Sequence, residues 1–129
     1  DRAEVHCLAS SAYVRMALES TSRAQALEYG GRAEQHTFDA LKHRSTEYSR
    51  SRVFDEIRLS KVRLVQREPV EAVTVARSAM DQAKGMRSSV AATRLRDVNR
   101  LFRRFYGDLR EVRDFGAELD TYLWNVTSA

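Results

Sequence analysis

The chain has 129 residues, of which 31% are charged and 43% hydrophobic, and its formal net charge is +4. These fractions are typical of a folded globular protein and exclude an intrinsically disordered segment. The length predicts a single domain with a core of its own. No apolar run approaches the ~18 residues that a membrane-spanning helix needs. One proline and five glycines leave few helix breakers, so long helices are expected.

The N-terminal residues are polar and include the single cysteine. The chain opens with Asp1-Arg2-Ala3-Glu4, without an initiating methionine and without the pattern of a secretory signal peptide. We therefore expect a fragment of a longer protein. Cys7 has no second cysteine with which to form an internal disulfide, and this favours the reducing environment of the cytoplasm.

A first helical hairpin is predicted over residues 12–43. Residues 2–8 either begin a helix or complete one from an upstream repeat. From Ala12 onward, apolar and small residues recur at helical steps. Gly30-Gly31 is expected to end this helix, because glycine adopts the left-handed conformation common after a helix C-terminus. The second helix then covers about 32–43, and its expected core residues are Ala33, Phe38 and Leu41.

A second hairpin is predicted over residues 52–84, with Pro69 at its turn. The polar stretch 44–52 before it is either a loop or the exposed start of the next helix. Proline loses a hydrogen bond and clashes inside a helix, but it is favoured at the first helical position. Pro69 therefore marks the start of the second helix. Glu71 places a negative charge near that N-terminus, where the helix dipole favours it.

A third hairpin is predicted over residues 88–123. Gly85 ends the preceding helix, and Ser88 or Ser89 caps the next one. Its apolar stripe consists of Ala91, Leu95, Val98, Phe102 and Phe105. Gly107-Asp108 breaks the run, with Asp108 and Glu111 as a capping box. The last helix ends in Tyr122, Leu123 and Trp124, which either cover the last hairpin or face a second copy of the chain. No strand-like alternation appears, so the predicted fold class is all-α.

The middle of the chain resembles a tetratricopeptide-type helix pair. The resemblance rests on Ile57-Arg58-Leu59-Ser60, Glu68-Pro69-Val70-Glu71-Ala72, Ala76 and Ala79. The segments Gly85-Met86-Arg87-Ser88-Ser89-Val90 and Arg94-Leu95-Arg96-Asp97-Val98-Asn99-Arg100-Leu101 are similar to the C-terminal helical-repeat region of bacterial, actinomycete-type regulators that carry an Xre-type helix-turn-helix domain. The resemblance implies about six to seven helices in stacked antiparallel hairpins that form a right-handed superhelix. The turn signals recur at nearly equal intervals, close to the ~34-residue period of such repeats.

A groove is the first candidate site that the resemblance implies. In stacked helix pairs the first helix of each pair lines the concave side. Placing the resembled repeat on this chain lines that side with Arg15, Arg23, Arg58 and Lys61. A basic groove favours an acidic peptide or a C-terminal carboxylate, which accepts charge-assisted hydrogen bonds. The alternative is that these residues form ordinary solvated surface.

A stripe of arginines is the second candidate site. Arg96, Arg100, Arg103 and Arg104 lie on one predicted helix and are candidates for contacting phosphates in a salt-dependent, sequence-independent manner. The aromatic residues beside them partly share the apolar stripe, which indicates a place in the core rather than a surface for base stacking. Ordinary solvated surface is the competing interpretation here too, because many arginines of the chain have acidic neighbours at helical spacing.

Metal and catalytic sites are not expected. His36 and His43 are about 10 Å apart along a helix axis, so they cannot share one zinc ion, and Asp39 with His43 lacks a third ligand nearby. Cys7 follows His6 directly, but neighbours on a helix point in different directions, so a buried cysteine is expected. No phosphate-binding loop, serine elbow or paired-cysteine motif is present. We expect no enzyme activity and no cofactor.

The predicted function is that of a non-enzymatic domain for protein or peptide interaction, ligand sensing or dimerisation in a bacterial transcription regulator. Its partner is a protein or peptide, or a second copy of the chain in a homodimer. The resemblance implies that DNA is contacted only through a missing N-terminal domain, that the protein is cytoplasmic, and that no membrane is involved. Two alternatives stay open: a stand-alone helical adaptor, and a basic helical bundle that binds nucleic acid.

Overall fold

The computed structural model describes residues 2–42 and 49–128, and within these ranges it contains six helices and no strand. The helices are α1 (Arg2–Glu19), α2 (Arg23–Lys42), α3 (Ser49–Val65), α4 (Pro69–Ala83), α5 (Ser89–Tyr106) and α6 (Arg110–Ser128). The predicted all-α class is therefore confirmed. In the described ranges no helix is long and apolar enough to cross a membrane.

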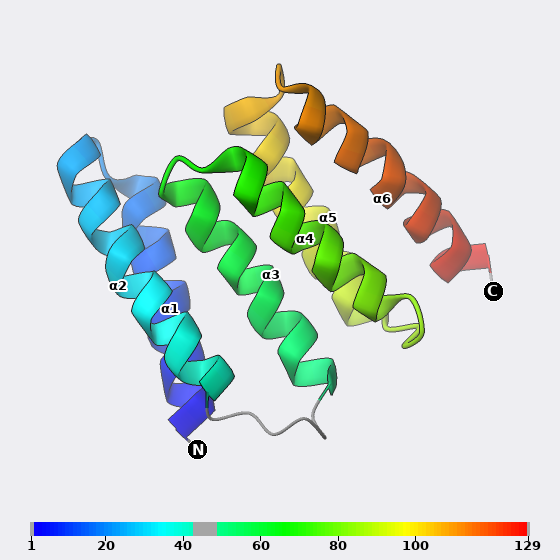
Figure 1. The fold of residues 1–129 in the computed structure, drawn as a ribbon, viewed down its shortest axis with the longest axis horizontal. Coiled ribbons are helices and arrows are strands. Elements are labelled where there is room, and N and C mark those ends of the chain that lie inside the picture. Colours follow the sequence, from blue (N-terminus) through cyan, green and yellow to red (C-terminus); the bar gives the residue numbers. More distant parts are fainter. Residues whose placement is uncertain (1, 43–48, 129) are drawn as a thin grey trace.

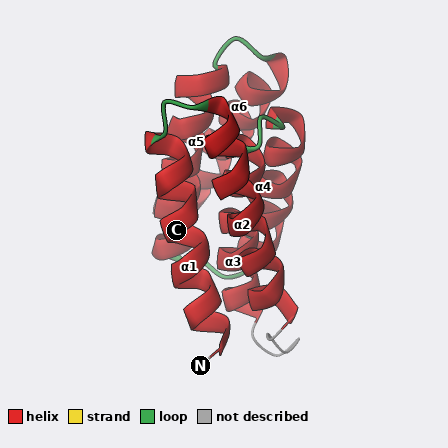
Figure 2. Ribbon diagram, turned by 90° about the vertical axis from the view of Figure 1, so that its left-hand side faces the viewer, coloured by secondary structure: helices red, strands yellow, loops and turns green. Residues whose placement is uncertain are grey.

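The helices lie side by side, and consecutive helices run antiparallel (Figures 1 and 2). Figure 1 shows α2, α3 and α4 next to one another, with α1 behind α2 and α5 behind α4. α3 contacts α1, α2, α4 and α5, while α6 contacts α4 and α5. Because α1 and α5 both flank α3 on one side, that face of α3 forms the floor between them.

The middle hairpin has the predicted form. Pro69 is the first residue of α4, and Gly85 follows shortly after its end. Arg67 takes the left-handed conformation that closes α3, with φ 64°, and its N–H donates to the Leu64 carbonyl at 3.0 Å. An arginine, rather than the glycine that usually occupies such a position, makes this turn.

The first hairpin differs from the prediction, which placed its turn at Gly30-Gly31. α2 runs through both glycines, and the chain turns instead between Ser20 and Ser22. Ser22 Oγ accepts a hydrogen bond from the Gln25 N–H at 3.3 Å, which makes Ser22 the N-cap of α2. The hairpin thus covers residues 2–42 and not 12–43. The serine cap, not the glycine pair, decides where the chain reverses.

Gly30 has a packing role in place of the expected turn. A Cβ built at this position would lie 3.1 Å from Gln66 Cγ and 3.4 Å from Val65 Cγ2, whereas one at Gly31 would meet nothing within 4 Å. Gly30 therefore permits the close approach of α2 to the end of α3. This use of glycine in a helix interior is invisible to a local reading of the sequence.

Some expected core residues are exposed because the predicted helix phase was incorrect. Phe38 is 42% exposed, and Thr37 and Ala40 are buried beside the correctly predicted Ala33. On α5 the predicted stripe is buried from Ala91 to Phe102, but Phe105 is 46% exposed.

The two predicted N-caps of the third hairpin have different outcomes. Ser88 Oγ accepts from the Ala91 N–H at 3.1 Å, so Ser88 caps α5 as predicted. α6 begins at Arg110, and the Leu109 carbonyl accepts its first helical hydrogen bond from Arg113. Leu109, and not Asp108, is therefore the N-cap residue. Of the predicted link 44–52, residues 44–48 lie outside the described residues, and α3 begins at Ser49.

Candidate functional site

A pocket of about 240 Å³ lies where α1, α3 and α5 meet. Four cationic side chains line it, and we call them together the basic groove: Arg15 from α1, Arg58 and Lys61 from α3, and Arg94 from α5. Its apolar lining comes from Val14, Leu18 and Leu101. The arrangement offers several positive charges around a partly apolar floor, which suits an anionic group carried on an apolar chain.

The structure brings together three of the four residues predicted to line a groove. Arg15, Arg58 and Lys61 share the pocket, whereas Arg23 is the first residue of α2 and does not line it. Placing Arg23 on the first helix depended on the turn at Gly30-Gly31. Arg94 was missed as a groove residue. Its position on the first helix of the third predicted hairpin was the signal that could have found it.

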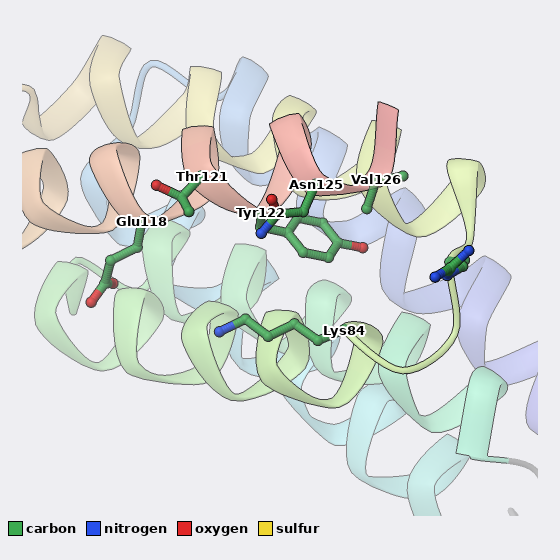
Figure 3. Close-up of a pocket in the computed structure, with 7 residues that line it drawn as sticks. Lys84, Glu118, Thr121, Tyr122, Asn125 and Val126 are labelled. Carbon is green, nitrogen blue, oxygen red and sulfur yellow. The ribbon is translucent and has the colours of Figure 1, made fainter. Parts of the chain in front are cut away.

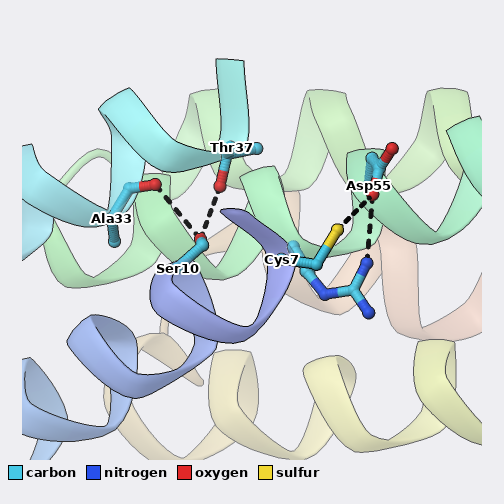
Figure 4. Close-up of polar contacts among 6 residues, drawn as sticks. Cys7, Ser10, Ala33, Thr37 and Asp55 are labelled. Carbon is cyan, nitrogen blue, oxygen red and sulfur yellow. Dashed lines mark hydrogen bonds and ion pairs between the residues drawn. The ribbon is translucent and has the colours of Figure 1, made fainter. Parts of the chain in front are cut away.

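Arg58 is held in place by a buried carboxylate. Its Nη1 donates to Asp55 Oδ1 at 3.1 Å, and Cys7 Sγ from α1 donates to the same oxygen at 3.1 Å (Figure 4). Asp55 is 0% exposed, so this contact between α1 and α3 is shielded from water. Cys7 is buried as predicted. The carboxylate therefore ties α1 to α3 and fixes the guanidinium at the groove wall.

Lys61 is the cation in the groove that a ligand anion would stabilise most. Burial lowers the pKa of its ammonium, the positive charges of Arg94 and Arg58 lower it further, and Asp97 opposes them. Asp97 also pairs with Arg100 at 3.4 Å, so its charge is shared. An anion placed beside Lys61 would favour the charged ammonium, and this attraction would offset both the cost of desolvation and the repulsion from the other cations.

Arg94 is positioned by an aromatic ring. Its guanidinium carbon lies 5.1 Å from the centre of the Phe54 ring, within the range of a cation–π contact. Arg94 is itself exposed, so its N–H donors are accessible to a ligand. Arg94 and Arg58 are therefore both oriented by neighbours before any ligand arrives.

The arginine stripe of α5 lies on the outer surface and is mixed with acidic residues. Arg96, Arg100, Arg103 and Arg104 are all exposed. Arg100 pairs with Asp97, and Arg104 stacks over the exposed Phe105 ring at 5.1 Å. Arg103 lines a pocket of about 630 Å³ between α5 and α6, and Asp108 and Asp120 also line it. The stripe is accessible, and Asp97, Asp108 and Asp120 lie beside its arginines.

Another pocket, of about 360 Å³, lies between the end of α4 and α6 (Figure 3). Tyr122 is 3% exposed, and within the described residues its hydroxyl has no hydrogen-bond partner. Burial raises the pKa of this phenol. Tyr122 thus covers the last hairpin, one of the two predicted outcomes, whereas Trp124 is 71% exposed. Lys84 and Glu118 give this pocket both signs of charge.

The histidines form a cluster that the sequence did not reveal. His6 Nδ1 and His36 Nδ1 are 2.9 Å apart, and Asp39 lies beside them. The sequence suggested His36 and Asp39 with His43, which lies outside the described residues. His6 comes from α1 and was considered only with Cys7. No local pattern could have paired it with a residue of another helix.

No protein-family model, curated protein or solved structure matches this chain.

Proposed function

We propose that this chain is a non-enzymatic interaction domain that binds an acidic peptide segment or a C-terminal carboxylate in the basic groove. The observation that supports the proposal is the convergence of Arg15, Arg58, Lys61 and Arg94 from three helices around one pocket, with Lys61 partly desolvated. The resemblance of the sequence to regulators with an Xre-type helix-turn-helix domain supports the further proposal that this is the partner-binding part of a transcription regulator.

The chemistry of the groove favours a carboxylate over a neutral ligand. Hydrogen bonds to charged groups contribute about 1.5 to 3 kcal/mol each, and a guanidinium presents paired donors that match a carboxylate. Arg58 and Arg94 are already oriented, so little side-chain entropy is lost on binding. The apolar floor of Val14, Leu18 and Leu101 would contact the carbon chain behind the charged group.

Fluorescence anisotropy with labelled peptides tests the proposal. We expect a peptide with a free, acidic C-terminus to bind more tightly than the same peptide with glutamine and asparagine in place of its acids and an amidated end. Lys61→Met removes the charge and keeps the chain length, and we expect it to weaken binding about tenfold, equivalent to about 1.4 kcal/mol. Lys84→Met, at the C-cap of α4 and outside the groove, is the matched control and should bind as the parent does.

The pH dependence provides an independent check. Because the folded state lowers the pKa of Lys61, the ammonium is lost at a pH below its ordinary range, and anion binding should weaken as pH rises through that lowered value. In the absence of ligand, stability changes with pH in the opposite direction. The unfolded state has the higher Lys61 pKa, so it binds the Lys61 proton more tightly than the folded state does. The free energy of unfolding should therefore rise with pH between the lowered pKa and the ordinary lysine pKa of 10.5. Equal binding of acidic and neutral peptides would refute the proposal.

The competing functions are separated by other measurements. Sequence upstream of Asp1 distinguishes a regulator, which would carry a helix-turn-helix domain there, from a stand-alone adaptor. Titration of labelled duplex DNA at two salt concentrations tests the arginine stripe. Binding that is lost in an Arg100→Gln, Arg103→Gln variant, but kept in Lys61→Met, would favour the nucleic-acid alternative.

A further inference from the structure

The side chains of His6, His36 and Asp39 meet on the surface between α1 and α2. One potential ligand atom from each residue lies within 4.8 Å of the other two. All three residues are partly buried, so they are accessible to an ion without being fully solvated. The cluster lies outside the basic groove, which takes no residue from α2.

The distances suit a small divalent ion after a modest adjustment. Two nitrogens bound to one tetrahedral zinc at about 2.0 to 2.1 Å are about 3.3 Å apart. The two Nδ1 atoms here are separated by 2.9 Å and share one hydrogen bond. An opening of a few tenths of an ångström, with exchange of the shared proton for the ion, would turn the hydrogen-bonded pair into two ligands. A carboxylate oxygen of Asp39 lies within 4.8 Å of a ring nitrogen of each histidine.

The surrounding structure holds the three ligands in place. One helical turn along from His6, Ser10 Oγ donates to the Ala33 carbonyl at 3.1 Å and hydrogen-bonds Thr37 Oγ1 at 2.6 Å. These buried bonds fix the position of α1 along α2. The His36 ring also stacks on Tyr13, with 5.6 Å between the ring centres.

Asp39 has an orienting neighbour of its own. Gln35 Nε2 donates to Asp39 Oδ1 at 3.2 Å. Partners of this kind orient metal ligands in known sites. In helical bundles, metal sites are built from such side chains on facing helices, including pairs three residues apart on one helix.

We propose that His6, His36 and Asp39 form a binding site for a divalent transition-metal ion of the zinc class, with water completing its coordination. Two imidazoles and one carboxylate favour zinc, cobalt, nickel or copper, whereas magnesium and calcium prefer oxygen ligands alone. The ion bridges α1 to α2 and therefore stabilises this hairpin, because it binds the folded state in which the two helices are together.

Calorimetric titration of the untagged chain with zinc chloride tests the proposal. We expect one equivalent to bind, with a higher midpoint of thermal unfolding, and we expect magnesium to have neither effect. Cobalt should bind at the same site and give the visible absorption of a tetrahedral nitrogen–oxygen complex. His36→Gln removes a ligand and should weaken zinc binding by about 100-fold, the upper end of the loss seen for groups that merely support a ligand.

Matched variants separate the cluster from adventitious binding. Asp39→Asn should weaken binding, whereas Asp81→Asn, which removes the same charge from an exposed ion pair on α4, should not. Cys7→Ser should leave binding intact if the ligands are those proposed. Zinc that binds equally well to the His36→Gln and Asp39→Asn variants, or that fails to bind the parent at micromolar concentration, would overturn the proposal.

Discussion

The helices of this molecule are held together in two different ways. Within the C-terminal half, α5 and α6 meet through large apolar side chains, and the Phe102 and Phe115 rings contact edge to face with centres 5.8 Å apart. Between α1 and α2 the buried side chains are smaller: the Ser10 and Thr37 hydroxyls lie 2.6 Å apart, and Val14, Ala17 and Ala33 belong to a second, smaller apolar cluster. One interface buries large apolar area, and the other buries small residues and polar groups.

The difference indicates which part of the chain supplies most of the stability and which part depends on contacts that fix the register of its helices. Burial of a large apolar side chain contributes roughly 1.5 to 3 kcal/mol, whereas a net hydrogen bond contributes about 1 kcal/mol. We therefore infer that the C-terminal half supplies most of the free energy of folding. The N-terminal pair relies on hydrogen bonds that fix its register, including the Cys7–Asp55–Arg58 contact that ties it to α3.

The largest expected effect comes from the C-terminal core. Phe102→Ala should lower the free energy of unfolding by about 3 to 5 kcal/mol, because it removes buried area and leaves a cavity beside Phe115. Phe105→Ala on the same helix is the matched control, since Phe105 is nearly half exposed, and should cost less than about 1 kcal/mol. Urea unfolding of both variants measures the two values. Similar losses would contradict the placement of these rings.

A smaller effect is expected in the polar interface. Ser10→Ala should cost about 1 to 2 kcal/mol, because it leaves the buried Thr37 hydroxyl without the hydrogen bond to Ser10. It should also speed hydrogen exchange of the α1 and α2 amides more than that of α5 and α6. Ser11→Ala, one residue along and exposed, should change stability by no more than about 0.5 kcal/mol. Uniformly faster exchange across all helices would remove the distinction between the two halves.

The smallest effect separates two adjacent glycines. Gly31→Ala should stabilise the protein by about 0.5 to 1 kcal/mol, because alanine is favoured inside a helix and its Cβ would meet nothing. Gly30→Ala should gain less or lose stability, because its Cβ must displace Gln66 and press on Val65. Thermal unfolding of the two variants gives the comparison. Equal stabilisation by both would show that α2 does not approach α3 as closely as described.

The sequence predicted features whose cause is local. Pro69 and Ser88 start helices as expected because their effects depend only on the first turn. The apolar stripe from Ala91 to Phe102 is also correct, since helical periodicity places it on one face. Gly30-Gly31 was misread because glycine serves both turns and close contacts, and only the neighbouring helix distinguishes the two. The resulting shift in helix bounds moved Arg23 out of the expected groove.

By itself, the sequence determined that the chain is all-α and where most of its helices begin and end, because periodicity, capping and proline act within a few residues. The groove was foreseen in part, through Arg15, Arg58 and Lys61, because a resemblance supplied the stacking of hairpins. Only the tertiary structure brought Arg94 to that groove and His6 to His36. Whether two such side chains lie close together depends on the axial position of one helix relative to another. Buried contacts between residues distant in the chain set that position.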